Sequence, residues 1–225
     1  MELAGLYLYS YLIGAVPTAY IIARLVKGVD IRRYGSGQVG GTNLVRCAGK
    51  GWLVPLGLFE LLVKGASPVL LAQYWLGLDR GSVELAVAPL LALAGHNWSV
   101  FLNFHGGRGI AVAVGALPAL SPLLLVGFLV VFGTGWLITR SAGIWTLVGL
   151  ALLPAWAAMA AEPAMVFWYC VALLALVILK RLLADGTPLP AGPARWEVLL
   201  NRLFRDRDIA DRDEWVRRAP GSRQS

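Results

Sequence analysis

Apolar segments about as long as a membrane-spanning helix recur along this chain from near Met1 to about Leu183. Hydrophobic residues make up 58% of the 225 residues, charged residues make up only 15%, and the mean hydropathy is +0.67. These values lie well outside the range of a soluble domain of this length. The sequence therefore predicts an all-α integral membrane protein, with one membrane domain over residues 1–183.

Seven apolar segments are predicted to be helical, and one of them is short. A bilayer core of about 30 Å needs about 20 helical residues, because each residue adds about 1.5 Å. Pro118, Ser121 and Pro122 divide one long run into a short helix and a full one. The short helix would reach about 17 Å, so it is expected to be a half-helix or a re-entrant segment. The seven segments are residues 3–23, 52–76, 83–102, 110–120, 123–138, 143–159 and 163–179.

The basic residues predict how the chain is oriented. Six of them lie between residues 24 and 50, against the single acid Asp30. Cytoplasmic loops carry an excess of Lys and Arg, so this loop is expected inside, the N-terminus outside and the C-terminus cytoplasmic. The net charge of +7 has the same explanation, so no nucleic-acid partner is expected.

Residues 184–225 are predicted to form a charged cytoplasmic tail. Between Arg195 and Arg218, apolar residues fall at helical spacing with arginines among them. This pattern is typical of an amphipathic helix that lies on the membrane surface or packs on the membrane domain. The alternative is a solvated, frayed tail. The apolar positions are Trp196, Leu199, Leu200, Leu203 and Phe204.

Two polar, glycine-rich segments interrupt the apolar sequence, at residues 34–46 and 95–109. Glycine lets a loop turn its backbone N–H groups toward one point, and arginine adds a planar fork of donors for phosphate. Both segments are expected on the cytoplasmic face. For the second segment, a tight turn with a topology-setting base is the simpler alternative.

The first segment also matches the G-x-G-x-x-G pattern of dinucleotide-binding proteins, from Gly35 to Gly40. That pattern needs a preceding strand in a βαβ unit, and here an apolar helix and a basic linker precede it. Nicotinamide and flavin cofactors are therefore not expected. What remains is a phosphate-binding arrangement of backbone donors and nearby cations.

Glu60 and Lys64 lie four residues apart within the second apolar segment. They share a helix face in the favourable orientation for an ion pair, so they can neutralise each other. Charges at membrane depth are costly, which favours a polar cavity or site that needs Lys64. The sequence has no metal-ligand spacing and no convincing Ser/His/Asp triad, so the chemistry should depend on positioning and charge stabilisation.

The two glycine-rich segments resemble motifs of the acyl-phosphate-dependent glycerol-3-phosphate acyltransferases, small bacterial membrane enzymes that begin phospholipid synthesis. The first motif, Gly-Ser-Gly-Asn-x-Gly-Ala-Thr-Asn-x-x-Arg, is met by residues 35–46. The second, Gly-His, Val-Phe and Gly-Gly-Lys-Gly, is met by residues 95–96, 100–101 and 106–109. The resemblance covers the membrane domain. It implies a seven-helix protein of the bacterial plasma membrane with a cytoplasmic-facing site.

The resemblance further implies that a fatty acyl group passes from acyl phosphate to glycerol 3-phosphate to give lysophosphatidic acid. No cofactor and no metal are expected, membrane lipid surrounds the protein, and no protein partner is identified. The predicted catalytic residues are Ser36, His96 and Arg108: Arg108 stabilises charge on the reacting phosphate, and the other two orient the acceptor hydroxyl. The predicted substrate-binding residues are Gly35, Gly37, Gly40, Thr42, Asn43, Arg46, Lys64, Asn97, Gly106, Gly107 and Gly109.

The chain departs from the family pattern at several positions. Gln38 and Arg108 stand where Asn and Lys are usual. The third motif, His-Arg-x-Asn-Ile-x-Arg after the last helix, has no clear match, although residues 180–183 keep its basic character. Two alternatives therefore stay open. One is an altered family member that binds lipid phosphates or acylates another acceptor, and the other is an ion-coupled carrier, which would need inverted repeats that are not evident.

Overall fold

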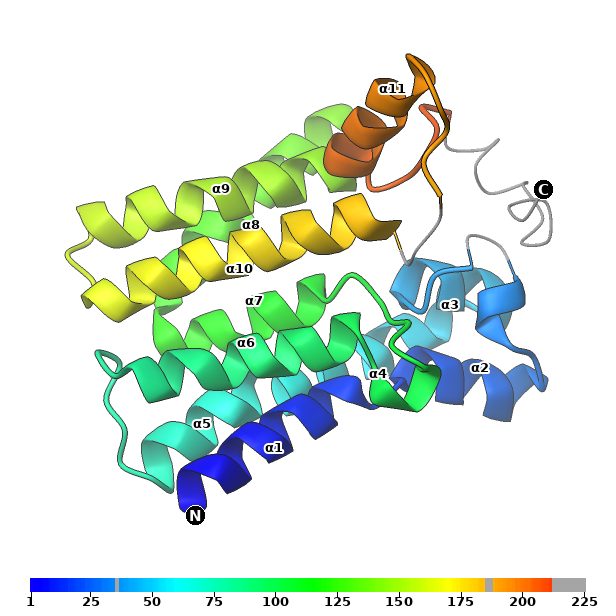
Figure 1. Cartoon of the computed structure of the whole chain (residues 1–225). Coiled ribbons are helices and arrows are strands. Elements are labelled where there is room, and N and C mark those ends of the chain that lie inside the picture. The colour runs from blue at the N-terminus through cyan, green and yellow to red at the C-terminus, as the bar shows by residue number, and fades with distance from the viewer. Residues whose placement is uncertain (35–36, 185–187, 212–225) are drawn as a thin grey trace.

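A computed structural model describes residues 1–34, 37–184 and 188–211, so the predicted site residues Gly35 and Ser36 lie outside the described residues. The fold is all-α, as predicted, and the long helices run side by side (Figure 1). Among the residues that the structure describes, five helical segments are long and apolar enough to cross a membrane, with α1 and α2 taken together as one segment, and two of the predicted segments form shorter apolar helices. The short helices α2, α3 and α11 gather at one end of the bundle, away from the N-terminus (Figure 1).

The first apolar segment is two helices, α1 (Glu2–Ala15) and α2 (Thr18–Lys27), rather than one continuous helix. Val16 adopts a ψ of 117° between them. Proline has no N–H, and its ring disfavours the helical conformation of the residue before it, so Pro17 separates the helices. The break exposes the carbonyl groups at the end of α1, and two of them accept side-chain hydrogen bonds from distant segments.

The second apolar segment is a continuous helix with a π-helical centre. It comprises α4 (Leu53–Leu58), the π-helical stretch η3 (Phe59–Ala66) and α5 (Ser67–Tyr74). The π-helical stretch holds both charged residues of the segment, Glu60 and Lys64, which are buried. Such wider turns inside α-helices are frequent at functional sites.

The next helix, α6 (Val83–Asn97), ends five residues before the predicted residue 102. Trp98 leaves the helical conformation, with φ −130° and ψ 71°, and a 3-10 turn, η4 (Val100–Leu102), follows. The early end brings His96 and Asn97 to the last turn of α6, next to the second glycine-rich segment.

Four helices complete the membrane domain: α7 (Ile110–Leu120), α8 (Pro122–Thr139), α9 (Ala142–Met159) and α10 (Ala164–Leu183). The predicted division between the short and the long helix is confirmed. Ser121 is extended between them, and its hydroxyl accepts a hydrogen bond from Leu124 N–H at the start of α8.

Small residues let neighbouring helices approach closely. A methyl group on Gly95 of α6 would overlap the Tyr11 carbonyl of α1, and one on Gly14 would overlap Ala92. Likewise, a methyl group on Gly115 of α7 would overlap the Leu61 carbonyl of η3. Close backbone contact through small residues is the usual way in which membrane helices associate, because burial of apolar surface gives little driving force in lipid. These contacts fix η3 and α6, which carry the polar residues of the site.

The C-terminal tail packs on the membrane domain. It forms α11 (Ala194–Leu200) and a π-helical turn, η6 (Asn201–Arg205), and η6 contacts both α9 and α10. The helix thus ends at Arg205, before the predicted Arg218. Two buried arginines fasten it: Arg181 donates to the carbonyls of Gly143 and Leu203, and Arg202 donates to that of Leu182.

Candidate active site

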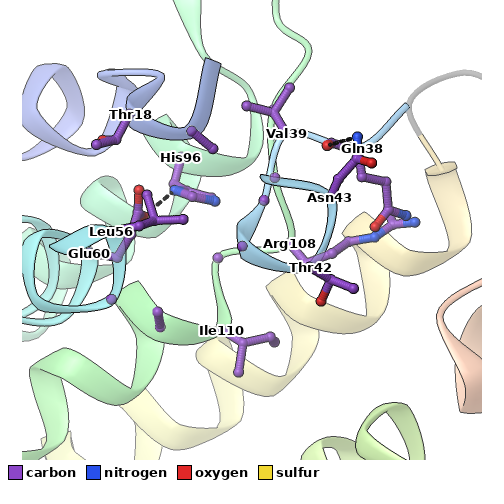
Figure 2. A pocket seen from close by; sticks show the side chains of 18 of the residues that line it. Thr18, Gln38, Val39, Thr42, Asn43, Leu56, Glu60, His96, Arg108 and Ile110 are labelled. Carbon is purple, nitrogen blue, oxygen red and sulfur yellow. Dashed lines mark hydrogen bonds and ion pairs between the residues drawn. The ribbon is translucent and has the colours of Figure 1, made fainter. Parts of the chain in front are cut away.

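A cavity of about 350 Å³ lies at the end of the bundle where the glycine-rich segments meet. Its wall comes from α2, η3 and the end of α6, from both glycine-rich segments, and from α9, α10 and the tail. Figure 2 shows Glu60 and His96 together on one side, and Gln38, Asn43 and Arg108 on the other. The cavity therefore combines residues from almost the whole length of the described chain.

Glu60, Lys64 and His96 form a buried polar cluster in this wall. The Lys64 ammonium lies 2.7 Å from one Glu60 oxygen and donates to the Val16 carbonyl at 2.6 Å. The other Glu60 oxygen lies 2.8 Å from His96 Nδ1. The two predictions made for Glu60 and Lys64 are thus compatible: they are an ion pair, and they also line a polar cavity. A buried pair of this kind needs further polar contacts, which here are the Val16 carbonyl for Lys64 and the His96 ring for Glu60.

Glu60 sets which nitrogen of His96 carries the proton. Nδ1 is 2.8 Å from the Glu60 carboxylate but 3.5 Å from the Lys64 ammonium, so the shorter contact assigns an N–H to Nδ1. In the neutral imidazole, Nε2 is then a hydrogen-bond acceptor. A methyl group on Gly107 would overlap Nε2, so this nitrogen faces the second glycine-rich segment.

The glycines of that segment are required by close packing. Gly106 lies against the His96 carbonyl, which accepts a hydrogen bond from Gly107 N–H at 3.1 Å. Gly109 has a φ of +69°, a conformation that residues with a Cβ rarely adopt, and has no room for one beside Leu93. The segment is thus tightly packed against the end of α6 and holds Arg108 between its glycines.

Arg108 is held by one ion pair and two hydrogen bonds, with partners from three parts of the chain. Its Nε lies 2.8 Å from Asp206 Oδ1 in the tail, and its Nη1 donates to the Lys180 carbonyl at 3.0 Å. With the Gln38 amide oriented so that its oxygen faces the guanidinium, that oxygen accepts from Nη2 at 2.7 Å. The side chain of Arg108 is only 13% exposed. Gln38, which departs from the family pattern, therefore orients the arginine that departs from it as well.

The second half of the first glycine-rich segment is helical, so the interpretation of the whole segment as a loop was wrong there. Gly40 precedes α3 (Gly41–Ala48). The buried Asn43 amide donates to the carbonyls of Ile31, Tyr34 and Gln38 at 2.9–3.0 Å. Asn43 thus holds the segment in shape, and the start of α3 is directed at the cavity.

The structure brings most of the predicted site residues together. Three of those it describes do not line the cavity: Gly37, the exposed Arg46, and Asn97, whose buried side chain has no hydrogen-bond partner among the described residues. The predicted residues that line the cavity are Gly40, Thr42, Asn43, Lys64, His96, Gly106, Gly107, Arg108 and Gly109.

Three charged residues of the cavity wall are absent from the predicted catalytic and substrate-binding residues: Glu60, Arg181 and Asp206. Glu60 was singled out with Lys64, but its contact with His96, 36 positions away, has no local signal. Arg181 and Asp206 lie beyond the glycine-rich segments and also line the cavity. The only available signal for Arg181 was the basic pair after the last apolar segment, and Asp206 had none.

Comparison with known proteins connects this geometry to a family. The family model for glycerol-3-phosphate acyltransferase matches residues 4–184. Glycerol-3-phosphate acyltransferase 4 of Dehalococcoides mccartyi is 37% identical over 93% of this chain and 90% of its own length. Glycerol-3-phosphate acyltransferase 2 of Moorella thermoacetica is 44% identical over 64% of this chain and 72% of its own length.

A solved structure gives the same result. The crystal structure of PlsY (YgiH), an integral membrane glycerol 3-phosphate acyltransferase, in its glycerol 3-phosphate form has a TM-score of 0.74 to this chain. The two are 29% identical, over 85% of this chain and 96% of that one. The chain belongs to the glycerol-3-phosphate acyltransferase family of integral membrane proteins.

Proposed function

We propose that this protein transfers a fatty acyl group from acyl phosphate to glycerol 3-phosphate and releases lysophosphatidic acid and inorganic phosphate, the first acylation of phospholipid synthesis. The observation that carries the proposal is a single cavity lined by both Arg108 and His96. The guanidinium of Arg108 is ion-paired with Asp206, and the imidazole of His96 contacts the Glu60 carboxylate. Relatives whose names state the acceptor, and a solved relative in a lysophosphatidic acid form, support it.

In the proposed reaction, the acceptor hydroxyl attacks the acyl carbonyl carbon. A new ester C–O bond forms, the C–O bond to the phosphate breaks, and the electron pair leaves on the phosphate. Arg108 offsets the charge that gathers on that phosphate, as a fixed cation does in a site that excludes water. Phosphate is a good leaving group, so the site needs no covalent intermediate on the protein.

The hydroxyl proton has two possible acceptors. His96 Nε2 is one, because the Nδ1 proton is held by Glu60 and the imidazolium formed would be stabilised by that carboxylate. A phosphate oxygen of glycerol 3-phosphate is the other. The pH dependence of turnover in His96→Ala separates them, because only the first route loses its acid limb in that variant.

The walls of the cavity suit substrates of this kind. Leu53, Leu56 and Phe132 contribute apolar lining, and Leu53 is half-exposed on the outer surface. An acyl chain could therefore enter from the bilayer while its phosphate lies at the polar end. Basic residues are frequent in residues 24–50 and in the tail. The helices α2, α3 and α11 of these segments lie at one end of the bundle (Figure 1), which supports a cytoplasmic site and an N-terminus outside the plasma membrane.

The test is turnover of acyl phosphate with glycerol 3-phosphate by the purified protein in lipid, without coenzyme A or metal. Plain glycerol and other phosphorylated alcohols serve as competing acceptors. Arg108→Ala should lower turnover about 10²- to 10³-fold, as the loss of one charge-stabilising donor does, whereas Arg33→Ala, at an exposed arginine outside the cavity, should leave turnover unchanged. Thermal stabilisation by glycerol 3-phosphate without any acyl transfer would favour the alternative of a catalytically altered phosphate-binding protein.

A further inference from the structure

The C-terminal segment from Asn201 to Asp208 lies outside the part of the chain that the family model matches, yet it reaches the cavity. Asp206 follows directly after η6, with a φ of +57°, and its carboxylate is the acidic partner of Arg108 at 2.8 Å. The side chain of Asp206 is only 22% exposed. An acid from the tail therefore touches the cation on which the proposed reaction depends.

We propose that Asp206 is a positioning residue for Arg108, and that the segment 201–208 is a fixed part of the acyl-transfer site. This inference rests on the proposed function. The family's third motif has no clear match after the last helix of this chain. The inference gives the tail a role in the site at this point of the sequence, namely to hold Arg108 in position.

The contacts of Arg108 support positioning. A guanidinium has five N–H donors. Among the described residues, Asp206 forms an ion pair at Nε, while the Lys180 carbonyl accepts from Nη1 and the Gln38 amide oxygen accepts from Nη2. Within the described part of the chain, each terminal nitrogen therefore keeps one N–H that can bind a phosphate oxygen. When an arginine is fixed before the substrate binds, its side-chain entropy is already lost and no longer adds to the cost of binding.

The anchoring of the segment argues against a movable latch. Arg181 and Arg202 are each 2% exposed. Arg181 of α10 donates to the Leu203 carbonyl of the tail, and Arg202 of the tail donates to the Leu182 carbonyl of α10. Arg202 also pairs with Asp208 at 2.8 Å, two residues after Asp206. Undocking the segment would remove the Leu203 carbonyl from Arg181, which is buried in α10, and would separate Arg202 from the Leu182 carbonyl, so that charged hydrogen bonds on both sides of the contact would be lost. A docked segment is therefore the resting arrangement.

The test is a double-mutant cycle on kcat/KM with the acyl donor that the intact enzyme uses. Asp206→Ala should lower kcat/KM roughly 10- to 100-fold, because a small displacement of a reacting group is that costly. Asp206→Asn keeps an oxygen acceptor and should lose less. In an Arg108→Ala background, Asp206→Ala should change kcat/KM by about twofold or less, since its effect passes through Arg108. Glu197→Gln removes an exposed charge of the same tail and should match the intact enzyme.

Three results would overturn the inference. One is a higher kcat/KM in Asp206→Ala, as for an inhibitory latch; another is the same loss of kcat/KM from Asp206→Ala with and without Arg108; the third is wild-type kcat/KM in Asp206→Ala.

Thermal stabilisation by glycerol 3-phosphate gives the same double-mutant cycle a readout that does not depend on the acyl donor. Failure of the proposed function is distinguishable, because the wild-type protein and Glu197→Gln would then show no acyl transfer at all.

Discussion

In the first glycine-rich segment, a methyl group added at Gly40 would meet no atom within 4 Å, whereas at Gly107 in the second it would overlap His96 Nε2 and lie 2.6 Å from the Val39 carbonyl. Both glycines line the same cavity. The open space at Gly40 is room for a ligand, and the contact at Gly107 is packing. Two similar glycine patterns thus have different physical roles, one leaving open space in the cavity and the other allowing close packing. Substitutions in the two segments should distinguish these roles.

The largest effect is expected for Gly107→Ala. The added methyl group would displace either the His96 ring or the backbone at Val39. Overpacking of this kind lowers the free energy of unfolding by about 1–3 kcal/mol or more. A lower melting temperature in detergent, together with loss of acyl transfer, is the expected result. A stable Gly107→Ala protein with normal turnover would show that the second segment is not packed as described.

Asn43→Ala should destabilise the first segment next most. Its buried amide donates to three backbone carbonyls, those of Ile31, Tyr34 and Gln38, and leaving buried acceptors unsatisfied costs about 1–3 kcal/mol. Asn97→Ala is the matched control, because the Asn97 amide is equally buried but has no hydrogen-bond partner among the described residues. The melting temperature should therefore fall clearly in Asn43→Ala and only slightly in Asn97→Ala.

Gly40→Ala is expected to leave stability unchanged and to lower activity. Gly40 has a φ of −162°, an extended conformation that alanine adopts freely, and the new methyl group would point into open space. If a substrate phosphate uses that space, kcat/KM should fall roughly tenfold, about 1.4 kcal/mol. Comparing melting temperature and turnover in one preparation checks this. Normal turnover would mean that the substrate lies elsewhere in the cavity.

The smallest effect is expected from acid pH at the base of the first segment. Asp30 lies before the turn that presents the Ile31 carbonyl to Asn43, and its hydrogen bonds with Arg32 lower its pKa below 3.8. The pair therefore stabilises the folded state above about pH 4 and loses this contribution as pH falls through the lowered pKa. Partly exposed pairs contribute about 0–1 kcal/mol. The melting temperatures of the wild-type protein and Asp30→Asn should differ at pH 6, and the difference should shrink as the pH is lowered below about 4.

The sequence predicted the helical membrane fold because apolar length is a local signal. It also predicted the break before α8, because Ser121 and Pro122 are local signals for the start of a helix, whereas Pro118, which was expected to contribute to the break, lies inside α7. It missed the interruption at Pro17, where hydrophobicity continues across the break. It also missed the early end of α6, which depends on distant contacts such as the hydrogen bond from Ser99 to the Ala15 carbonyl.

The part of the candidate site that consists of contiguous sequence motifs could be predicted. Arg108, His96 and Lys64 were found because glycine patterns and a charge inside an apolar run stand out in sequence. The partners that orient them did not. Glu60 meets His96 across two helices, and Asp206 meets Arg108 across 98 positions, and neither contact leaves a periodic pattern. Orientation of a site is decided by tertiary packing, which a single sequence does not record.

The break at Pro17 has a consequence for where a positive charge can reside at membrane depth. A continuous helix would have used the Val16 carbonyl for its own ladder, whereas the interrupted one offers it to the Lys64 ammonium at 2.6 Å. Interrupted helices in membrane transporters present backbone carbonyls to sodium ions in the same manner. Here the cation is tethered to the protein, so a covalently attached ammonium takes the place that a diffusible ion fills in those proteins.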